Sequence, residues 1–407
     1  MTRASIVWLF VVALLLLVLL EWARVYFIMP FPGSQLGLNE PESSSLGRVE
    51  LAYWLHRNVT WLRVVGLLVL AYPAYQLLIK SKRTLHWYLV IGLLITYGGV
   101  LYMVNRELMA DQMFLQPIYK RVVPMSQNEI SLDKLVLGFE SVGQATAYPI
   151  QLIGYHHQVR DTVGGQPIMI TYCTVCRTGR VFSPLVNGQA DDFRLVGMDH
   201  FNAMFEDKRT GTWWRQATGE AVVGPLAGQA ILELPARQMT LREWVKEHPN
   251  TRVLQADSTF ADEFKGMKNY ERGLSKGTLT RRDSGSWQPK SWVIGVEKAG
   301  FAKAYDWNQL QKQRVLSDVV GGEPIVLTMA GDSVSFGAWS RRLGVKTLTF
   351  QYANRQLKDQ ETGSVWTWRG QCINGVLKGK RLTPIPDAYQ EFWHSWRTFH
   401  PGTARAQ

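Results

Sequence analysis

Three long apolar segments in the N-terminal third constrain the fold more than any other feature of this sequence. Residues 4–20 and 85–104 contain no charged side chain, and residues 64–79 are equally apolar although they include Pro73. A helix of about 20 apolar residues crosses the hydrocarbon core of a bilayer and satisfies its own backbone hydrogen bonds there. The first segment lacks the small-x-small cleavage site of a signal peptide. We therefore predict three transmembrane helices within residues 1–104.

The charges between these segments predict how the chain is oriented. Residues 80–83 read Lys-Ser-Lys-Arg. The preceding connection carries three acidic and two basic residues: Glu40, Glu42, Glu50, Arg48 and Arg57. Because short basic connections stay in the cytoplasm, residues 80–83 and Arg3 are expected inside, and everything after residue 104 outside. We predict a multi-pass protein of the inner (cytoplasmic) membrane whose soluble body faces the periplasm.

The overall charge is basic, with a formal net charge of +12. A basic chain invites a nucleic-acid interpretation, but no Lys/Arg cluster is interleaved with aromatic residues as a base-stacking groove requires. We therefore expect no nucleic-acid partner. Attraction to the anionic surface of a lipid bilayer is the simpler account of the charge.

The remainder of the chain contains an internal repeat. Leu-Gly-Phe-Glu at 137–140 recurs as Ile-Gly-Val-Glu at 294–297, and further blocks follow in the same order. The other repeated blocks are 147–148 with 304–305, 161–167 with 318–324, 168–171 with 325–328, 210–214 with 362–366, and 244–249 with 396–401. The offset is 157 residues for the earlier blocks and 152 for the last two. Such ordered self-similarity predicts two tandem copies of one domain.

Each copy has the pattern of short strands that end in a helix. Residues 167–172 form an apolar run typical of a buried strand, and Asn187-Gly188 is typical of a tight hairpin. Thr240 with Glu243 has the spacing of a helix-capping box, and Asp387 with Gln390 is a looser version. We predict an α+β class, with a three-helix transmembrane region followed by two homologous, mainly antiparallel β domains. The predicted boundaries are 1–104 for the membrane region, 105–265 for the first domain, 266–292 for a linker rich in Gly, Ser, Lys and Arg, and 293–407 for the second domain.

The repeat also acts as an internal control, because residues shared by both copies are candidates for folding and residues confined to one copy are candidates for function. Soft or titratable side chains of the first copy are replaced in the second. The pairs are Cys173 with Ala330, Cys176 with Ser333, His156 with Gln313, His157 with Arg314, Met198 with Phe350, and His200 with Tyr352. We therefore predict one active copy and one supporting copy. The lone Cys372 of the second copy is expected to be a small buried residue.

Cys173 and Cys176 form a Cys-x-x-Cys motif at the end of the predicted strand. Two thiols at this spacing can form a redox-active pair, and nearby positive charge lowers a cysteine pKa. Outside the cytoplasm such a pair can equally be a structural disulfide. A third alternative is a soft-metal site, in which thiolates and other ligands bind copper(I). The ligands in that case would be Cys173, Cys176, His157, Met198 and His200. No His follows the motif, which excludes c-type haem attachment.

These motifs resemble the bacterial family catalogued as domain of unknown function 3179. The resemblance rests on Gly-Gln-Ala-x-Ala-Tyr-Pro at 143–149, Asp-Thr-Val-Gly-Gly at 161–165, Thr-Tyr-Cys-x-x-Cys at 171–176 and Gly-Pro-Leu-Ala-Gly at 224–228. It extends from about residue 135 to 403. It implies a thiol site, because some members carry selenocysteine at the position that matches Cys176, and a selenol suits redox catalysis. The family supplies no activity.

We therefore predict a membrane-anchored extracytoplasmic thiol-redox protein, an oxidoreductase of undefined substrate. Cys176 is expected to be the attacking thiolate, Cys173 its resolving partner and His157 a proton donor or acceptor. A membrane or periplasmic redox partner is expected, and no cofactor is required. The alternatives are the copper-binding protein and a non-catalytic interaction module whose disulfide pins a loop.

Overall fold

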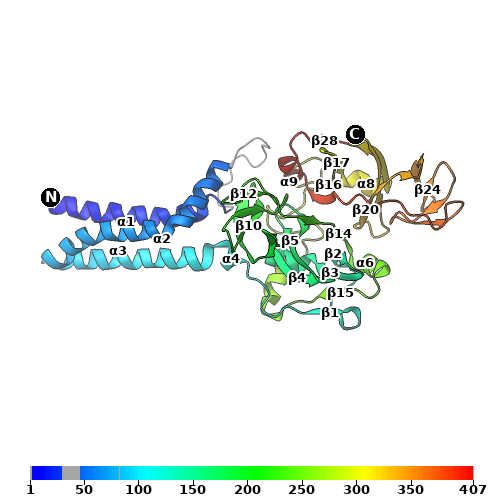
Figure 1. Cartoon of the computed structure of the whole chain (residues 1–407). Helices are drawn as coiled ribbons and strands as arrows, with labels where there is room; N and C mark the ends of the chain where they lie inside the picture. The colour runs from blue at the N-terminus through cyan, green and yellow to red at the C-terminus, as the bar shows by residue number, and fades with distance from the viewer. Residues whose placement is uncertain (1, 30–45, 82, 407) are drawn as a thin grey trace.

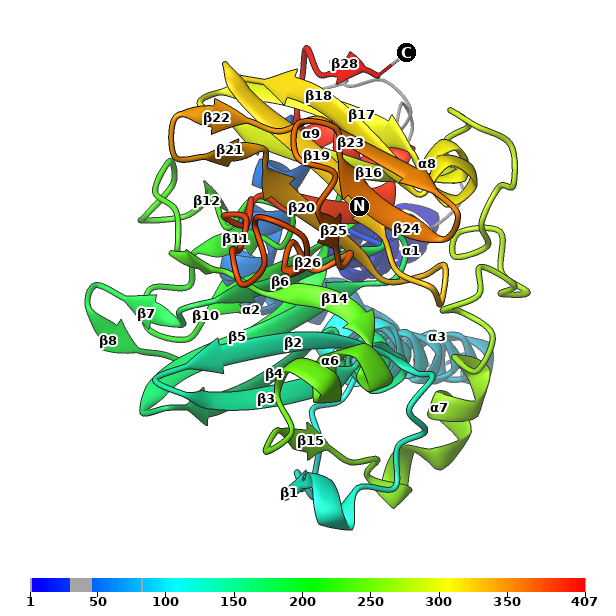
Figure 2. The ribbon, with the colours of Figure 1, turned by 90° about the vertical axis from the view of Figure 1, so that its right-hand side faces the viewer.

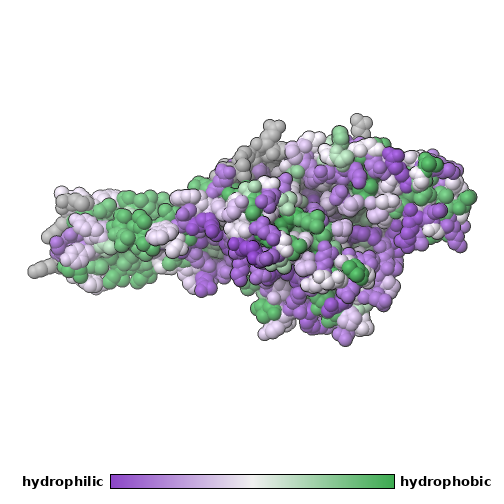
Figure 3. Space-filling view, in the orientation of Figure 1, coloured by the Kyte–Doolittle hydropathy of each residue, from purple (hydrophilic) through white to green (hydrophobic). Residues whose placement is uncertain are grey.

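A computed structural model describes residues 2–29, 46–81 and 83–406. Three long helices lie side by side as a rod that leads into the soluble body (Figure 1). They are α1 (Arg3–Tyr26), α2 (Leu46–Tyr75) and α3 (Thr84–Met103), with π-helical extensions η1 (Gln76–Lys80) and η2 (Val104–Leu108). As predicted, all three are long and apolar enough to cross a membrane. The space-filling view shows apolar side chains along the visible face of the rod (Figure 3).

The orientation rests partly on residues that the structure does not describe. Glu40, Glu42 and Lys82 lie outside the described residues. Lys80 ends η1, and Arg83 precedes α3. This connection lies at the end of the rod that is remote from the soluble body (Figure 1).

A buried ionic cluster ties the three helices together near the soluble body. The Glu21 carboxylate of α1 is fully buried, and it accepts from Arg63 of α2 (2.6 Å) and from Arg24 (2.9 Å). Asn105 of η2 accepts from both arginines at 2.9 and 3.1 Å. A buried charge in an apolar helix is costly unless it is paired. This cluster therefore fixes how the three helices pack against one another.

The first half of the soluble body, residues 105–265, is built from three main sheets. They have the strand orders β1-β15-β3-β2-β14, β13-β6-β5-β4 and β12-β11-β10-β9, and a β7-β8 hairpin is added. The elements are α4 (Ala110–Met113), β1 (Val122–Pro124), η3 (Met125–Gln127), β2 (Leu135–Ser141), β3 (Gln144–Pro149), α5 (Ile150–His156), β4 (Gln158–Val163), β5 (Gln166–Cys173), β6 (Thr178–Phe182), β7 (Leu185–Val186), β8 (Gln189–Ala190), β9 (Phe193–Asp199), β10 (Asn202–Asp207), β11 (Trp213–Arg215), β12 (Ala221–Val223), β13 (Glu233–Leu234), β14 (Arg237–Thr240), α6 (Leu241–Glu247), β15 (Arg252–Leu254), η4 (Ser258–Phe260) and α7 (Ala261–Gly266).

The second half, residues 292–406, repeats most of these strands in the same order, and in its described residues no sheet strand corresponds to β1 or β13. Its orders are β27-β16-β17-β28, β18-β19-β20 and β23-β24-β25-β26, with a β21-β22 hairpin. The elements are β16 (Trp292–Lys298), β17 (Phe301–Asp306), α8 (Trp307–Gln313), β18 (Val315–Val320), β19 (Glu323–Met329), β20 (Phe336–Ser340), β21 (Arg342–Leu343), β22 (Lys346–Thr347), β23 (Phe350–Ala353), β24 (Gln356–Asp359), β25 (Val365–Trp366), β26 (Cys372–Asn374), β27 (Ala388–Phe392), α9 (Trp393–Phe399) and β28 (Ala404–Arg405). The mixed α+β class with many antiparallel sheets agrees with the prediction. Figure 2 shows the second half stacked on the first.

One contact shows how the two halves are related. The Gln238 side chain of β14 donates to the Gln390 side chain of β27 (2.5 Å). These two residues are 152 positions apart, so each contacts its own counterpart in the other half. In addition, the Thr240 amide donates to the Ser335 hydroxyl of the second half, and the Phe392 amide at the corresponding position donates to the Cys176 carbonyl oxygen of the first. The halves therefore pack reciprocally, and each presents its α6 or α9 helix to the other.

Most local expectations are confirmed. The strand at 167–172 is β5, and Asn187-Gly188 forms the turn between β7 and β8. The Thr240 hydroxyl accepts from the Glu243 amide and caps α6. The proposed cap at Asp387 is wrong: residues 388–392 form β27, and α9 begins only at Trp393. The residue that corresponds to Thr240 is Phe392, which has no capping side chain, so the similar spacing at Asp387 was coincidental.

Candidate functional site

The Cys-x-x-Cys motif lies on a tight turn between two paired strands. Cys173 ends β5 and pairs with Thr178, the first residue of β6, so residues 174–177 form the connection. Arg177 closes the turn in the left-handed region with φ of 59°. Both thiols are free, and neither cysteine has measurable exposure to solvent. The turn thus brings two cysteine side chains together in a buried environment.

The sulfur of Cys173 is surrounded by hydrogen-bond donors. Burial raises the pKa of this thiol, but hydrogen bonds from the Cys176 thiol and from the backbone amides of Ala203, Cys176 and Val175 bring the net shift downward. Such donors favour the charged form of an acid. When protonated, the thiol donates to the Phe201 carbonyl oxygen at 3.4 Å. Cys173 is therefore the member of the pair that more readily becomes a thiolate.

Cys176 has the opposite environment. Burial, followed by the hydrogen bond and charge of Cys173, holds the pKa of the Cys176 thiol well above its ordinary value. Its sulfur lies 3.9 Å from Nε2 of His394, and its carbonyl oxygen accepts from the Phe392 amide (3.0 Å). Burial, followed by the charge of Lys290, lowers the pKa of His394 well below its usual range. A neutral His394 therefore faces a protonated Cys176.

A buried lysine completes the surroundings of the pair. Lys290 donates from Nζ to the Val175 carbonyl oxygen in the turn itself (2.6 Å). Burial lowers its pKa to about 8, although the two cysteine sulfurs act in the opposite direction. Its ammonium group lies 4.9 Å from the centre of the Phe392 ring. Lys290 and His394 both come from the chain beyond the first half, so the site is shared between the halves.

The membrane helices form another side of the site. One continuous apolar core contains both cysteines and residues from the soluble ends of α1 and η2. The members from the helix ends and the following segment are Val25, Met29, Val104, Met109 and Ala110. The Met198 amide also donates to the Ile28 carbonyl oxygen just beyond α1 (2.7 Å). The thiols therefore lie where the first half, the second half and the membrane rod meet.

His157 lies beside the motif strand, but its described hydrogen bond does not reach a thiol. Its carbonyl oxygen accepts from the Tyr172 amide, and its Nδ1 lies 3.0 Å from the Tyr155 carbonyl oxygen. The ring packs on Phe114 with centroids 4.4 Å apart. Burial lowers the pKa of His157 to about 4, which leaves the ring neutral at physiological pH. His157 therefore contacts the strand that carries Cys173 through its backbone carbonyl oxygen and not through a described side-chain hydrogen bond.

The remaining predicted metal ligands separate into two groups. Met198 lies in the same buried core as both thiols. His200 instead forms a hydrogen bond with Asp199, with Nδ1 and Oδ1 2.8 Å apart, and its ring faces Phe399. Within the described residues, no group of three or more His, Cys, Asp or Glu side chains is placed to hold a metal ion. Cys372, as expected, is a small buried residue with 1 % exposure.

Sequence reasoning missed His394 and Lys290. The comparison of the two copies identifies reactive side chains of the first copy that the second copy lacks. His394 and Lys290 lie after the first copy, so that comparison does not include them. The same comparison applied in reverse gives a signal, because His394 corresponds to Arg242 at the offset of 152. No sequence pattern within one copy predicts that α9 packs on the thiol turn, where His394 contacts Cys176, 218 residues earlier in the chain.

Comparison with known proteins gives a family but no function. Residues 115–403 match the model of DUF3179, a family described as proteins of unknown function. No curated protein and no solved structure gives a significant match.

Proposed function

Because the chain belongs to the DUF3179 family, whose function is unknown, we propose a function from the geometry of its site: a membrane-anchored thiol-redox protein that exchanges two electrons through Cys173 and Cys176. The observation that carries the proposal is the opposite tuning of two adjacent buried thiols. Donors converge on Cys173, whereas burial and the neighbouring sulfur keep Cys176 protonated. A structural disulfide needs no such asymmetry, but a nucleophile with a proton-bearing partner does.

The proposed reaction transfers two electrons to a disulfide substrate. The Cys173 thiolate attacks one substrate sulfur, which forms a mixed disulfide and releases the other sulfur as a thiolate. Cys176 then attacks the Cys173 sulfur, with His394 Nε2 as the hydrogen-bond acceptor for its departing proton, and the second substrate thiolate is released. The pair ends as a disulfide and the substrate as a dithiol, and the proton of Cys176 and one proton from solvent pass to the released thiolates. The reverse sequence oxidises a dithiol substrate.

These roles reverse the ones suggested by the sequence, in which Cys176 attacked and His157 moved the proton. The amide donors around Cys173 and the pKa shift they produce favour Cys173 as nucleophile. His394 is preferred for proton transfer because its Nε2 lies 3.9 Å from the Cys176 sulfur. Lys290 supports the thiolate as a buried cation bonded to the turn.

The test is the rate of alkylation of each thiol as a function of pH, in the full chain held in lipid nanodiscs. A Cys372→Ala background leaves only the pair, and Cys173→Ser and Cys176→Ser then leave one thiol each. We expect the thiol of Cys173 to titrate below that of Cys176. Cys173→Ser should also abolish mixed-disulfide formation. If Cys176 titrates first, the proposed assignment fails.

The burial of both cysteines limits which substrates can reach them. Neither cysteine is exposed, and α9 together with residues 289–291 covers the turn. A protein substrate therefore requires a larger movement of this cover than a small oxidant such as a peroxide does. Comparing oxidation of the pair by hydrogen peroxide with oxidation by a protein disulfide distinguishes these cases. Fast reaction with both would show that the cover opens readily.

Copper(I) binding remains the second candidate, favoured by one observation. Met198 lies in the same buried core as both thiols, and His394 lies next to Cys176, which together offer soft ligands. This alternative predicts that Met198→Leu weakens binding of Cu(I), measured by competition with a chromogenic chelator. The redox proposal predicts that Met198→Leu leaves the reduction potential of the pair nearly unchanged.

We also propose that the soluble body faces the periplasm and that its halves arose by duplication. The basic connection at Lys80 lies at the far end of the rod, which supports the orientation. Labelling of Lys80→Cys in intact cells by a membrane-impermeant maleimide should fail, and efficient labelling would contradict the orientation.

The matching strand orders support duplication. An experimental structure in which β2–β6 do not superpose on β16–β20 would contradict it.

A further inference from the structure

Two clefts lie between the halves, and they occupy corresponding places. The larger, of about 610 Å³, lies between β14 with α6 of the first half and β20 with the following strands of the second. The smaller, of about 390 Å³, lies between β27 with α9 of the second half and β6 of the first. Glu140 and His248 line the larger cleft, and their counterparts Glu297 and His400 line the smaller one. The two clefts therefore follow from the reciprocal packing of the halves.

Their walls differ in charge. Four cationic side chains and two carboxylates line the larger cleft, whereas one cation and three carboxylates line the smaller one. Two of the changes occur at corresponding positions. Arg237 of the larger cleft corresponds to Tyr389, and Arg369 corresponds to Ala217. A fold requirement would keep such positions alike, so the charge of the larger cleft is not dictated by packing alone.

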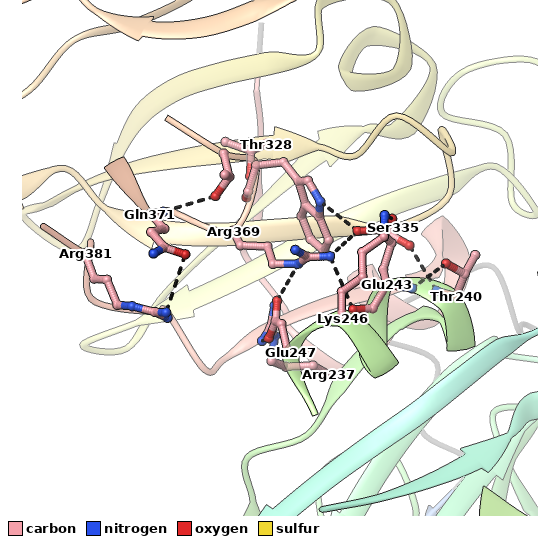
Figure 4. Close-up of polar contacts among 12 residues, drawn as sticks. Arg237, Thr240, Glu243, Lys246, Glu247, Thr328, Ser335, Arg369, Gln371 and Arg381 are labelled. Atoms are coloured by element: carbon pink, nitrogen blue, oxygen red, sulfur yellow. Dashed lines mark hydrogen bonds and ion pairs between the residues drawn. The ribbon is translucent and has the colours of Figure 1, made fainter. Parts of the chain in front are cut away.

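The arginines of the larger cleft come from both halves (Figure 4). Arg237 and Arg369 share the Glu247 carboxylate, which lies 2.7 Å from Nε of Arg369. Arg381 differs, because its described polar contact is to the neutral Gln371 side chain at 3.4 Å. An arginine remains charged at any physiological pH. Arg381 therefore places a positive charge at the wall of the cleft, and none of its described contacts is with a carboxylate.

The aromatic wall of this cleft is formed by apolar side chains of both halves. It comprises Trp244 of the first half with Trp339, Phe336 and Leu382 of the second, and Pro384 and Pro386 lie beside them. Indole and phenyl rings offer flat surfaces on which an apolar or aromatic body packs. The volume lies within the range of pockets for small organic molecules. Apolar walls with a few convergent polar groups are the usual composition of such a pocket.

We propose that the larger cleft binds a small organic anion, a carboxylate attached to a flat apolar body, with Arg381 binding the carboxylate and the aromatic wall packing on the body. Guanidinium groups bind carboxylates through paired, charge-assisted hydrogen bonds. The cleft is formed jointly by the two halves, so a bound anion also bridges them. This inference concerns a site apart from the thiols and does not depend on their redox role.

The test uses 2-naphthoate as probe and the full chain in lipid nanodiscs, with heats of binding measured by titration calorimetry against empty nanodiscs. The matched probe 2-naphthylmethylammonium has a similar shape and the opposite charge. We expect binding of 2-naphthoate and at least about tenfold weaker binding of the cation. Arg381→Gln should weaken 2-naphthoate by about tenfold, because hydrogen bonds to charged groups contribute effects of this size.

The control substitution is Lys378→Gln, an exposed cation of the same half that does not line the cleft. It should leave the affinity for 2-naphthoate unchanged. Trp339→Leu, which retains an apolar side chain, should weaken binding without altering charge. No binding of 2-naphthoate, equal affinity for the cationic probe, or an equal effect of Lys378→Gln and Arg381→Gln would each overturn the proposal.

Discussion

The two halves of the soluble body each place a turn between corresponding strands, yet the two turns differ in backbone and in partners: the left-handed residue is Arg177 in the first and Ser333 in the second. In the first half the turn between β5 and β6 carries Cys173 and Cys176, and α9 with Lys290 packs on it. In the second half the positions are Ala330 and Ser333, and Arg314 donates to the Ser333 hydroxyl (2.8 Å). Ordinary hydrogen bonds thus complete the second turn, whereas sulfur, histidine and lysine complete the first.

The comparison shows which features follow from the fold and which do not. His157 and Arg314 both end a helix in the left-handed region, with φ of 61° and 69°, so this backbone conformation is common to the halves. Among the described residues, the apolar core that contains the ends of the membrane helices includes both thiols and no residue of the second half. The thiols therefore lie where the soluble body meets the membrane rod.

The largest expected effect on redox activity comes from substituting the cysteines of the first half by the corresponding residues of the second. Cys173→Ala and Cys176→Ser, which copy Ala330 and Ser333, should abolish two-electron exchange, because neither variant can form the disulfide. The measurement is turnover of a dithiol or disulfide substrate by the full chain. Cys372→Ala is the matched control and should retain full turnover. A Cys176→Ser variant that still turns over would show that the pair does not act together.

The second prediction concerns the histidine that the second half supplies. His394→Gln should slow the step in which Cys176 attacks Cys173, by about a hundredfold, since a positioned proton acceptor contributes at least this much. The rate of mixed-disulfide resolution, followed by rapid quenching, measures it. His248→Gln, which removes a histidine at the end of the other inter-half helix, should leave the rate unchanged. Equal slowing by both variants would indicate a general effect on packing.

The third prediction tests what the halves share. A Cβ added at Gly138 would lie 2.4 Å from the Trp244 ring, and one at Gly295 would lie 2.1 Å from the Trp396 ring. Gly138→Ala and Gly295→Ala should each lower the free energy of unfolding by about 1–3 kcal/mol, the usual cost of overpacking. Thermal unfolding measures this, with Gly331→Ala as control because open space surrounds that position. A large loss of stability for only one of the two variants would show that the cores of the two halves are not equivalent.

The fourth and smallest effect is a dependence of stability on pH. Burial lowers the pKa of His157 to about 4 from its ordinary value of 6.5. Between these pH values the unfolded chain binds a proton that the folded chain does not, so stability falls as the pH drops from 6.5 to 4. His157→Asn, which tolerates the left-handed backbone, should reduce this dependence by up to about one proton. An unchanged pH profile would show that His157 does not titrate in this way.

The membrane helices, the α+β class and the thiol motif could be read from the sequence because each depends on local pattern. Apolar length predicts α1, α2 and α3, and apolar runs with turn residues predict β5 and the β7-β8 hairpin. The repeat offsets predict matching elements, and most strands of the two halves follow the same order, with β1 and β13 as the exceptions among the described residues.

The shared part of the site could not be read in this way. His394 and Lys290 reach the thiol turn only because the halves pack reciprocally, and no spacing within one half encodes that contact. His200 was a candidate ligand in the copper alternative, because the second copy lacks a titratable group at that position, yet its ring nitrogen bonds to the adjacent Asp199 carboxylate. The opposite charges of the two inter-half clefts likewise depend on residues that come together only after the halves pack.

The most direct test of the central claim is the reduction potential of the Cys173–Cys176 pair, measured in the full Cys372→Ala chain equilibrated with thiol–disulfide buffers. The redox account predicts a potential between about −120 and −270 mV, the range of catalytic thiol pairs. A potential below about −300 mV would identify a structural bridge and contradict the account.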